Sequence, residues 1–567
     1  MMIRSQITLI ERDRTASWFP GLYNHRTVEH FRETFTPAET TVLNRFFTNV
    51  DRPVFGLINL PEVVKGALFA RYSRSPKSVR RLFLDEFMEN PETGIETIAA
   101  QLDDDDPLIN LRRAEQLYDR VFFEYGDDSV AQLGGVHLAV EQASNVLTKI
   151  LEWGRLASYL EQSTRYIYYD ARLGDRYRYQ VPPEIAGSPL SAEYTDYMDG
   201  LFDTYSTVVA IMTEFFAERF PKQGGDSSFV WKSTIRAKAC DTARGLLPAA
   251  TLSNVGIYGT GQAYEMALLR MQAHPLAEVR QYGDMMLEEL RKTIPSFLRR
   301  VDLPDRGVLA SRYQARIAQE MREIAAEMVA EPEPSAAVTL TDWDPDAETK
   351  LVAAALYSVT DLPDVQLTGI AGRLSGEERA RIIAAYVGDR GNRRHKPGRA
   401  MERSAYRFDM LCDYGAFRDL QRHRMLTLEW QPLSARLGHD TPVELAEVEP
   451  PLVAVWQETM ERAGAFYETA RETLGIDVAQ YVVPFAFNVR FVMQMNAREA
   501  VHLIELRTQP AGHRGYRLVC QEMHRQIREV AGHHNIADAM RFVDYSDPDL
   551  ERLESERRAE KRRGTWY

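Results

Sequence analysis

Two clusters of residues have the types and spacing that could bind phosphate groups and flat rings. Arg422-His423-Arg424 places two guanidinium groups around an imidazole. Arginine suits bidentate phosphate binding, and histidine can donate a hydrogen bond or stack on a ring. Glu161, Ser163 and Arg165 alternate, so in an extended segment their side chains share one face. That face could offer a carboxylate to a ribose, a hydroxyl donor and a guanidinium to a phosphate. The alternative for either cluster is a set of ion pairs on a helix surface.

A third group of polar residues lies in a run with helical periodicity. Asn496-Ala497-Arg498-Glu499 is followed by His502, and Arg498 and His502 share one helical face. Arg270 and Arg507 each end an apolar helical run, where an arginine can simply complement the helix dipole. Taken alone, these features also fit ordinary amphipathic helices.

Three segments occur twice in the same order, which predicts a tandem duplication. In each copy a cluster of Arg, Ser or Thr and Glu is followed by a proline segment and then by a helix that ends in Leu-Arg. The first copy contains Arg155–Tyr166, Arg244–Pro248 and Met266–Arg270, and the second contains Arg422–Arg436, Gln480–Pro484 and Leu503–Arg507.

Length and composition restrict the class of protein. The 567 residues exceed the roughly 250–300 at which a single core stops growing, so we expect at least two domains. Hydrophobic residues make up 44% and charged residues 27%, as in ordinary globular proteins. The formal net charge of −13 argues against nucleic acid as a partner, although arginines gathered in one pocket could hold a phosphorylated small molecule.

Several other functional classes are also disfavoured by the sequence. Cys240, Cys412 and Cys520 stand far apart, which excludes a disulfide framework or a cysteine zinc site and fits a cytoplasmic location. No apolar run is long enough to span a membrane, and no secretory signal begins the chain. His533-His534 has no carboxylate at a metal-ligand spacing, so no metal site is expected. The chain has neither a dinucleotide-binding glycine motif after a strand nor a P-loop.

The coarse secondary-structure prediction is a mixed α/β protein with more helix than strand. Alternating proline and acidic residues at 331–346 predict a linker. The expected organisation is an N-terminal extension (1–50), a first repeat (51–330), the linker (331–346), a second repeat (347–550) and a charged tail (551–567). Apolar periodicity predicts helical segments, listed here in chain order: Ala131–Leu151, Tyr264–Leu269, Leu351–Tyr357, Ala380–Tyr386 and Arg498–Leu506.

Together these segments resemble the flavin-dependent thymidylate synthases (the ThyX family), present as a tandem duplication. The family signature is Arg-His-Arg, then seven residues, then Ser, followed later by an Asn-Ala-Arg helix that ends in Leu-Arg. The resemblance covers roughly 126–280 and 399–517. It includes Gly126-Asp-Asp-Ser129-Val130, which looks like a family segment whose serine lies near the flavin. The resemblance implies two copies of an α/β (α+β) fold, each a mixed sheet flanked by helices, that form a pseudo-dimer.

The two copies depart from the family pattern in opposite ways. The first has Trp153-Gly154 in place of the first Arg-His, and Gly259-Thr260-Gly261 where Asn-Ala-Arg is expected. The second has its Ser-x-Arg displaced by two residues, and Gln480 is the counterpart of Arg244. Each copy retains what the other has lost.

The family's active sites lie between subunits of a homotetramer, so the fused copies are expected to build one composite site. A homodimer of this chain would then be a pseudo-tetramer with about two working sites. The resemblance assigns FAD to one set of residues and dUMP to another, with Arg507 facing the pyrimidine and Arg507 and Arg422 as the catalytic pair. The FAD set is Arg422, His423, Arg424, Asn496, Arg498, His502 and Ser129, and the dUMP set is Glu161, Gln162, Ser163, Thr164, Arg165, Arg244 and Arg507.

The reaction implied by the resemblance is reductive methylation of dUMP to dTMP. Methylenetetrahydrofolate supplies the carbon, reduced FAD the hydride, and NADPH reduces the flavin again. An arginine against the uracil carbonyls would stabilise the negative charge that develops on the ring. The alternatives are methylation of a different pyrimidine nucleotide, a flavin- or nucleotide-binding homologue without turnover, and a structural protein whose arginines are surface charges.

Overall fold

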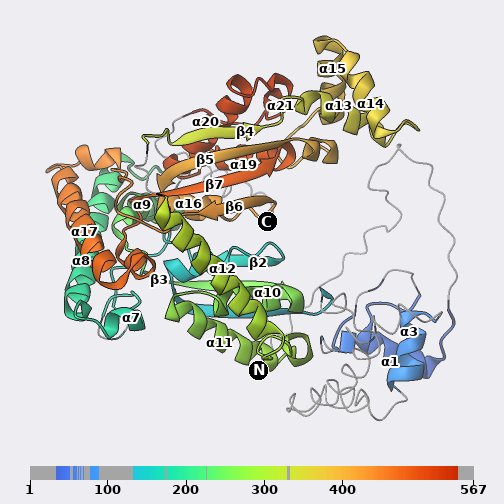
Figure 1. Cartoon of the computed structure of the whole chain (residues 1–567), viewed down its shortest axis with the longest axis horizontal. Helices are drawn as coiled ribbons and strands as arrows, with labels where there is room; N and C mark the ends of the chain where they lie inside the picture. The colour runs from blue at the N-terminus through green and yellow to red at the C-terminus, as the bar shows by residue number, and fades with distance from the viewer. Residues whose placement is uncertain are drawn as a thin grey trace. The chain divides into compact units, whose positions relative to one another are not determined.

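The computed structural model describes residues 33–51, 55, 57–60, 62, 64–65, 68, 77–88, 132–172, 174, 176–224, 226–328 and 333–546 (Figure 1). The chain divides into two compact units, Met1–Val130 and Ala131–Tyr567. Ser129, its segment 126–130 and the tail 551–567 lie outside the described residues.

The described residues of the first unit include three short helical elements: α1 (Pro37–Phe46), α3 (Val79–Leu82) and the π-helix η1 (Phe83–Met88). Helix α1 begins with a capping box, in which Thr36 Oγ1 accepts from the backbone N–H of Glu39 and Glu39 accepts from that of Thr36. Phe46 and Phe83 pack together, with ring centroids 5.2 Å apart.

The second unit contains the two sheets of the duplicated fold, one in each copy, and both sheets are antiparallel. The first sheet has the strand order β1-β3-β2, and the second has β4-β5-β7-β6. The first copy consists of β1 (Gly135–Ser144), α6 (Asn145–Leu151), β2 (Ala157–Glu161), α7 (Pro183–Ala186), α8 (Ser191–Arg219), α9 (Ser228–Ala243), η5 (Arg244–Leu246), β3 (Leu252–Thr260), α10 (Gly261–Gln272), α11 (Ala277–Arg291), η6 (Pro295–Leu298) and α12 (Gly307–Glu327).

The second copy repeats this order after the strand β4 and the helices α13 to α15. Its elements are β4 (Val338–Trp343), α13 (Ala347–Tyr357), α14 (Asp364–Arg373), α15 (Gly376–Val387), η7 (Arg399–Arg403), β5 (Ala405–Asp413), α16 (Tyr414–Leu420), β6 (Leu426–Trp430), η8 (Val443–Ala446), α17 (Val453–Leu474), α18 (Ile476–Ala479), η9 (Gln480–Val482), β7 (Asn488–Asn496), α19 (Ala497–Arg507), α20 (Arg514–Glu529) and α21 (His534–Asp538). Two tandem α/β copies, each with a sheet flanked by helices, confirm the predicted fold class. The expected mixed sheets are, among the described strands, purely antiparallel.

Strand register shows which residues of the two copies correspond. Ala157 and Glu161 at the ends of β2 pair with Gly259 and Val255, as Leu426 and Trp430 of β6 pair with Met495 and Phe491. Glu161 is therefore the counterpart of Trp430. The short helices α6 and α16 precede these strands at the same spacing. Trp153-Gly154-Arg155 in the first copy is therefore equivalent to Arg422-His423-Arg424 in the second.

The structure corrects two details of the sequence alignment. Thr260 and Asn496 both cap the helix that follows them, because each side chain accepts the backbone N–H three residues later. The first-copy equivalent of Asn496-Ala497-Arg498 is therefore Thr260-Gly261-Gln262, and not Gly259-Thr260-Gly261. Arg270 falls one position earlier in α10 than Arg507 does in α19, so the two Leu-Arg pairs are not equivalent.

Two secondary-structure predictions were wrong. The described part of the predicted helix Ala131–Leu151 contains the strand β1 followed by α6, and is not one helix. A bulge between Val140 and Ala143, with Gln142 at φ 55°, interrupts the alternation that would have indicated a strand. The predicted linker 331–346 contains β4, which pairs with β5. The other four predicted helices lie within α10, α13, α15 and α19.

The two copies join through a pseudo-symmetric contact at their proline segments. Pro248 and Pro484 form a bridge with each other. The N–H of Ala249 donates to Val483 O at 2.8 Å, and the N–H of Phe485 donates to Leu247 O at 2.9 Å. These backbone bonds fix η5 against η9, and thereby fix Arg244 relative to the second copy.

Two long helices, α8 and α17, extend this contact at one end of the unit (Figure 1). The rings of Tyr197 and Phe466 pack 4.6 Å apart between them, and Tyr197 donates to Val482 O at 2.8 Å. Among the described residues, no helix is both long and apolar enough to cross a membrane.

Candidate active site between the two copies

A buried carboxylate of the first copy holds the arginine cluster of the second. Glu161 ends β2, and its side chain has no solvent exposure. It accepts hydrogen bonds from Arg418 at 2.8 Å, Lys149 at 3.1 Å and Arg422 at 3.4 Å. Burial alone would raise the pKa of Glu161, but these cations outweigh burial and hold the pKa well below its usual range. The charged pair Glu161–Arg422 therefore links the two copies.

Arg165 and Arg244 lie together on the first copy. Arg165 forms a bidentate ion pair with Asp241, with distances of 2.6 and 2.7 Å. Arg244 follows one turn after Asp241 and is 4.0 Å from it. Its Nη2 is buried and has no hydrogen-bond partner among the described residues. An unpaired buried donor is costly, so this nitrogen is suited to an anionic ligand.

Asp419 gathers the cations of both copies around one carboxylate. Arg507, Arg422 and Arg244 approach it at 3.6, 3.7 and 3.8 Å. Burial would raise the pKa of Asp419, but the surrounding arginines lower it, so the group is ionised. Three guanidiniums held at these distances leave donors that a phosphorylated ligand can use.

A cavity of about 300 Å³ opens beside this cluster. Arg165, Asp241 and Arg244 line it from the first copy, and Asp413 and His513 from the second. Its lining, within the described part of the chain, does not include Arg422 or Arg507, which are connected to it through Asp419. The volume is at the lower end of small-ligand pockets and fits one nucleotide better than a dinucleotide.

The other residues predicted to bind the nucleotide have mainly structural contacts. The segment after Glu161 turns, so Glu161, Ser163 and Arg165 do not share one extended face. Ser163 Oγ accepts from the backbone N–H of Arg165 at 3.3 Å. Thr164 Oγ1 accepts from Arg418 at 3.2 Å, and the backbone N–H of Gln162 donates to Asn254 O at 2.8 Å.

The residues expected to bind flavin are grouped around the beginning of α19. Arg498 donates to Pro397 O at 2.9 Å and to Glu402 at 3.0 Å. Asn496 uses its side-chain oxygen as the helix cap, which leaves its amide group as a donor. His502 contacts Glu499 at 3.4 Å and is about one-third exposed.

Arg424 makes no hydrogen bond or ion pair with any described residue, and it lines a second cavity of about 400 Å³. This cavity is also lined by His423 from the same copy and by Trp153, Tyr159 and Arg270 from the first copy. The free guanidinium of Arg424 and the amide of Asn496 fit the phosphates and polar ring edges of FAD.

The counterpart of the Glu161–Arg422 pair is aromatic. Trp153 replaces Arg422 and Trp430 replaces Glu161, and their rings meet edge to face with centroids 5.9 Å apart. Trp153 Nε1 also donates to Leu428 O at 3.0 Å. One interface between the copies is therefore ionic, and its pseudo-symmetric counterpart is apolar.

The described residues of the second copy contain no equivalent of the Arg165 and Arg244 pair. Gln480 replaces Arg244, and Arg436, the counterpart of Arg165, forms its ion pair at the surface. Gln480 accepts from the N–H of Leu433 and donates to Asp477 O, both at 3.1 Å. Arg436 keeps the local turn, since its N–H donates to Ser434 Oγ, but its side chain is 54% exposed and pairs with Glu468 at 2.6 Å.

Sequence reasoning missed several acidic residues and the cations Lys149 and Arg418. A usable signal was present, because three of these acids precede a predicted site residue by three positions on a helix. These pairs are Asp241–Arg244, Asp419–Arg422 and Glu499–His502.

Comparison with known proteins places the chain in a family. The sequence profile of the thymidylate synthase complementing proteins matches residues 83–296 and 339–532, which together make up more than half of the chain. The chain belongs to this family. The two matches confirm that the family's domain is present twice, as the repeated motifs predicted.

Relatives of similar length share this organisation. A UPF0159 protein of Chlamydia muridarum is 38% identical over 528 residues, covering 92% of this chain and 98% of that protein. A UPF0159 protein of Thermoplasma acidophilum is 31% identical over 528 residues, covering 88% and 99%. Among solved structures, the UMP/dUMP methylase PolB from Streptomyces cacaoi, bound with 5-Br dUMP, is 18% identical and covers 39% of this chain and 100% of that chain. The TM-score between the two structures is 0.28, too low for conclusions about the chain described here.

Proposed function

We propose that this chain is a flavin-dependent thymidylate synthase that methylates dUMP to dTMP at one composite site between its two copies. One observation carries the proposal. The interface that joins Glu161 to Arg422 remains ionic and lies next to Arg165 and Arg244, whereas its counterpart has become the Trp153–Trp430 pair. One half-site has kept the groups that bind anions, and the other has lost them.

Arg165 and Arg244 are the proposed phosphate ligands. Both line the 300 Å³ cavity, and Arg244 Nη2 is a buried donor that a phosphate oxygen would satisfy. Asp241 holds Arg165 in place through its bidentate pair. Glu161 is not a proposed ligand of the nucleotide, because among the described residues its side chain contacts only cations of the protein. Its role is to orient Arg422.

Arg507 is the proposed group beside the pyrimidine. Its guanidinium is nearly buried and lies 3.6 Å from Asp419. A fixed cation in a water-poor site stabilises negative charge on the base carbonyls without reorganisation when carbon 5 becomes nucleophilic. Asp419 balances the charge of the arginines before the nucleotide arrives, and so keeps them assembled.

The proposed flavin ligands are Arg422, Arg424, Asn496, Arg498 and His502, together with His423 and Ser129 from the family resemblance. When bound, FAD supplies the hydride, with NADPH as reductant and methylenetetrahydrofolate as carbon donor. The protein's own part is to bind, orient and exclude water. The proposed assembly is a homodimer, which would be a pseudo-tetramer of the family's domains.

The visible absorption spectrum of the purified protein tests this function. FAD is added first, and then dUMP and NADPH are added without oxygen. The proposal predicts a flavin spectrum that bleaches faster when dUMP is present, followed by dTMP formation once methylenetetrahydrofolate is supplied. Flavin that binds but does not respond to dUMP would indicate a different nucleotide. A protein that binds no flavin would contradict the proposal.

A further inference from the structure

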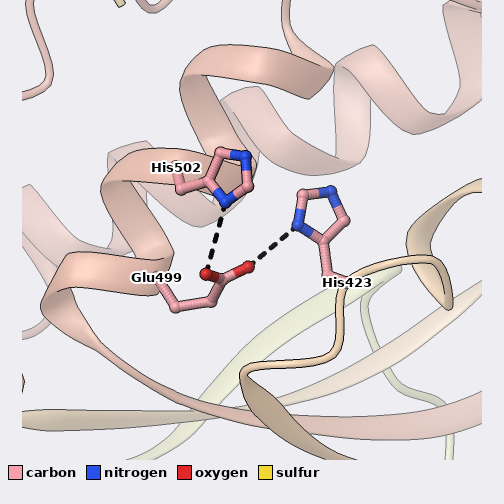
Figure 2. A group of neighbouring side chains, drawn as sticks. All are labelled: His423, Glu499 and His502. Atoms are coloured by element: carbon pink, nitrogen blue, oxygen red, sulfur yellow. Dashed lines mark hydrogen bonds and ion pairs between the residues drawn. The ribbon is translucent and has the colours of Figure 1, made fainter. Parts of the chain in front are cut away.

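His423, the central residue of the Arg-His-Arg segment, uses both ring nitrogens inside the protein. Nδ1 lies 2.9 Å from Glu499 Oε1, and Arg507 Nε donates to Nε2 at 3.0 Å. The ring is buried, with a side-chain exposure of 3%. Figure 2 shows Glu499 between the two imidazoles, with one carboxylate oxygen directed at each.

These two contacts determine the tautomer of His423. Arg507 Nε carries a hydrogen and can only donate, so Nε2 must accept. Burial lowers the pKa of His423 to about 4, so the neutral ring has a single N–H, which must be on Nδ1. That N–H donates to Glu499. Burial would raise the pKa of Glu499, but its bonds to His423 and His502 lower it to about 2, so the acceptor is ionised.

The same three side chains could be considered as a metal site. Their ligand atoms lie within 4.8 Å of one another. However, a metal on Nδ1 would require a proton on Nε2, which would place two N–H groups against each other where Arg507 donates. A guanidinium beside the ring also disfavours a divalent cation by repulsion. The contacts therefore favour a hydrogen-bonded chain over a metal centre.

We propose that Glu499 is a positioning residue that fixes the tautomer of His423 and, through it, directs the guanidinium of Arg507 into the nucleotide site. This inference rests on the proposed function, in which Arg507 faces the pyrimidine. Glu499 and Arg507 lie at opposite ends of α19, and His423 from the loop before β6 connects them. His423 is then a link to the nucleotide arginine, and because both ring nitrogens are used, only the carbon atoms of its ring remain to contact the flavin.

The hydrogen bonds can be tested without any ligand. In protein labelled with nitrogen-15 in histidine and arginine, the His423 signal is assigned by its loss in His423→Gln, and the Arg507 signal by its loss in Arg507→Lys. The proposal predicts a neutral Nδ1–H ring at pH 7, and an Arg507 Hε signal protected from solvent exchange. In Glu499→Leu that protection should be lost. An Nε2–H ring in the wild-type protein, or Zn²⁺ that binds this cluster, would overturn the proposal.

Two variants of Glu499 separate the hydrogen bond from its charge. Glu499→Leu leaves the Nδ1–H without an acceptor, and we expect dUMP affinity to fall about tenfold. Glu499→Gln keeps an oxygen that can accept, so affinity should stay within about threefold. In Glu499→Leu the loss of dUMP affinity should exceed the loss of FAD affinity, because the 2.9 Å bond to His423 leads to Arg507, whereas the contact with the flavin ligand His502 is longer, at 3.4 Å.

Glu505→Gln is the matched control, because Glu505 is buried on the same helix and pairs with Arg390 at 2.6 Å. It should lower the melting temperature and leave dUMP affinity unchanged. Unchanged dUMP affinity in Glu499→Leu would overturn the proposal. If the wild-type protein binds no dUMP, the proposed function fails. The histidine and Arg507 signals then still show whether Glu499 fixes the His423 tautomer and the position of Arg507.

Discussion

At the scale of single residues, the candidate site is a set of arginines held in place by acids. Asp241 orients Arg165, Glu161 orients Arg422, and Asp419 lies among the remaining guanidiniums. Arginine keeps its charge when buried, so these acids make a preassembled anion site compatible with burial. Without a carboxylate, the same cations would repel one another.

Arg165 and Arg436 are sequence counterparts with different surroundings, which gives a direct comparison. Arg165→Ala should weaken dUMP binding about 100-fold, because a charge-assisted contact to the phosphate is lost. Arg436 is half exposed and pairs with Glu468, so Arg436→Ala should cost about threefold or less. Titration calorimetry with dUMP measures both. Equal losses at the two positions would mean that both half-sites bind nucleotide.

At the scale of elements, the strands β2 and β6 and the loops before them carry the residues that make the two interfaces different, Glu161 with Arg422 and Trp153 with Trp430. Trp153→Arg alone should lower the free energy of unfolding by about 1–3 kcal/mol, because it removes the contact with Trp430 and the bond to Leu428 O. Adding Trp430→Glu should recover about 1 kcal/mol, since the new pair imitates Glu161 and Arg422. Urea denaturation of both single variants and the double variant measures this coupling. Strictly additive effects would show that the two tryptophans are independent.

Helix α16, which leads to the Arg-His-Arg segment, begins at an aspartate with an unusual titration. Asp413 Oδ1 accepts from the N–H of Ala416 at 2.9 Å, and burial raises the pKa of Asp413 to about 7. In the unfolded chain the group ionises near pH 3.9. Between about pH 4 and pH 7 the folded chain keeps a proton that the unfolded chain loses, so stability falls as pH rises.

Asp413→Asn should therefore be more stable than the wild type, because asparagine keeps the cap without the buried charge. The difference in melting temperature should grow from pH 5 to about pH 7 and stay constant above it. Thermal melts between pH 5 and pH 8 check this. A difference that does not vary with pH would show that Asp413 titrates normally.

The elements also show how far the sequence alone could predict this structure. Arg422-His423-Arg424 and the repeated proline segments were recognisable because their chemistry depends on residue type, whereas the Leu-Arg pairs looked equivalent and are one helical position apart. The strand β1 was not, because its bulge at Val140–Ala143 breaks the alternation of buried and exposed residues. The contact of Arg418 with Glu161 joins residues far apart in the chain, and no local pattern encodes it.

At the scale of the whole molecule, fusion allows the two copies to differ. In a homotetramer every half-site has the same residues, whereas a tandem chain can keep one pair of complementary surfaces and close the other. Glu161 and Arg422 belong to one chain and touch directly. The composite site can therefore form without exchange of chains.

Mixing two inactive variants tests whether the site forms within a single chain. Arg165→Ala removes a residue that the first copy contributes to the site, and Arg422→Ala removes one that the second copy contributes. If each site forms within one chain, every chain in the mixture lacks one of the two arginines. We expect no dTMP formation after the two proteins are unfolded together and refolded as a mixture. Wild-type protein taken through the same treatment is the control. Recovery of activity in the mixture would place the site between chains.

The central claim is one composite nucleotide site per chain, and the stoichiometry of dUMP binding to the FAD-saturated protein tests it most directly. Calorimetric titration should give one dUMP per chain, and Arg165→Ala should weaken that binding about 100-fold. Two equivalent dUMP molecules per chain, or a single dUMP whose affinity is unchanged in Arg165→Ala, would contradict the account.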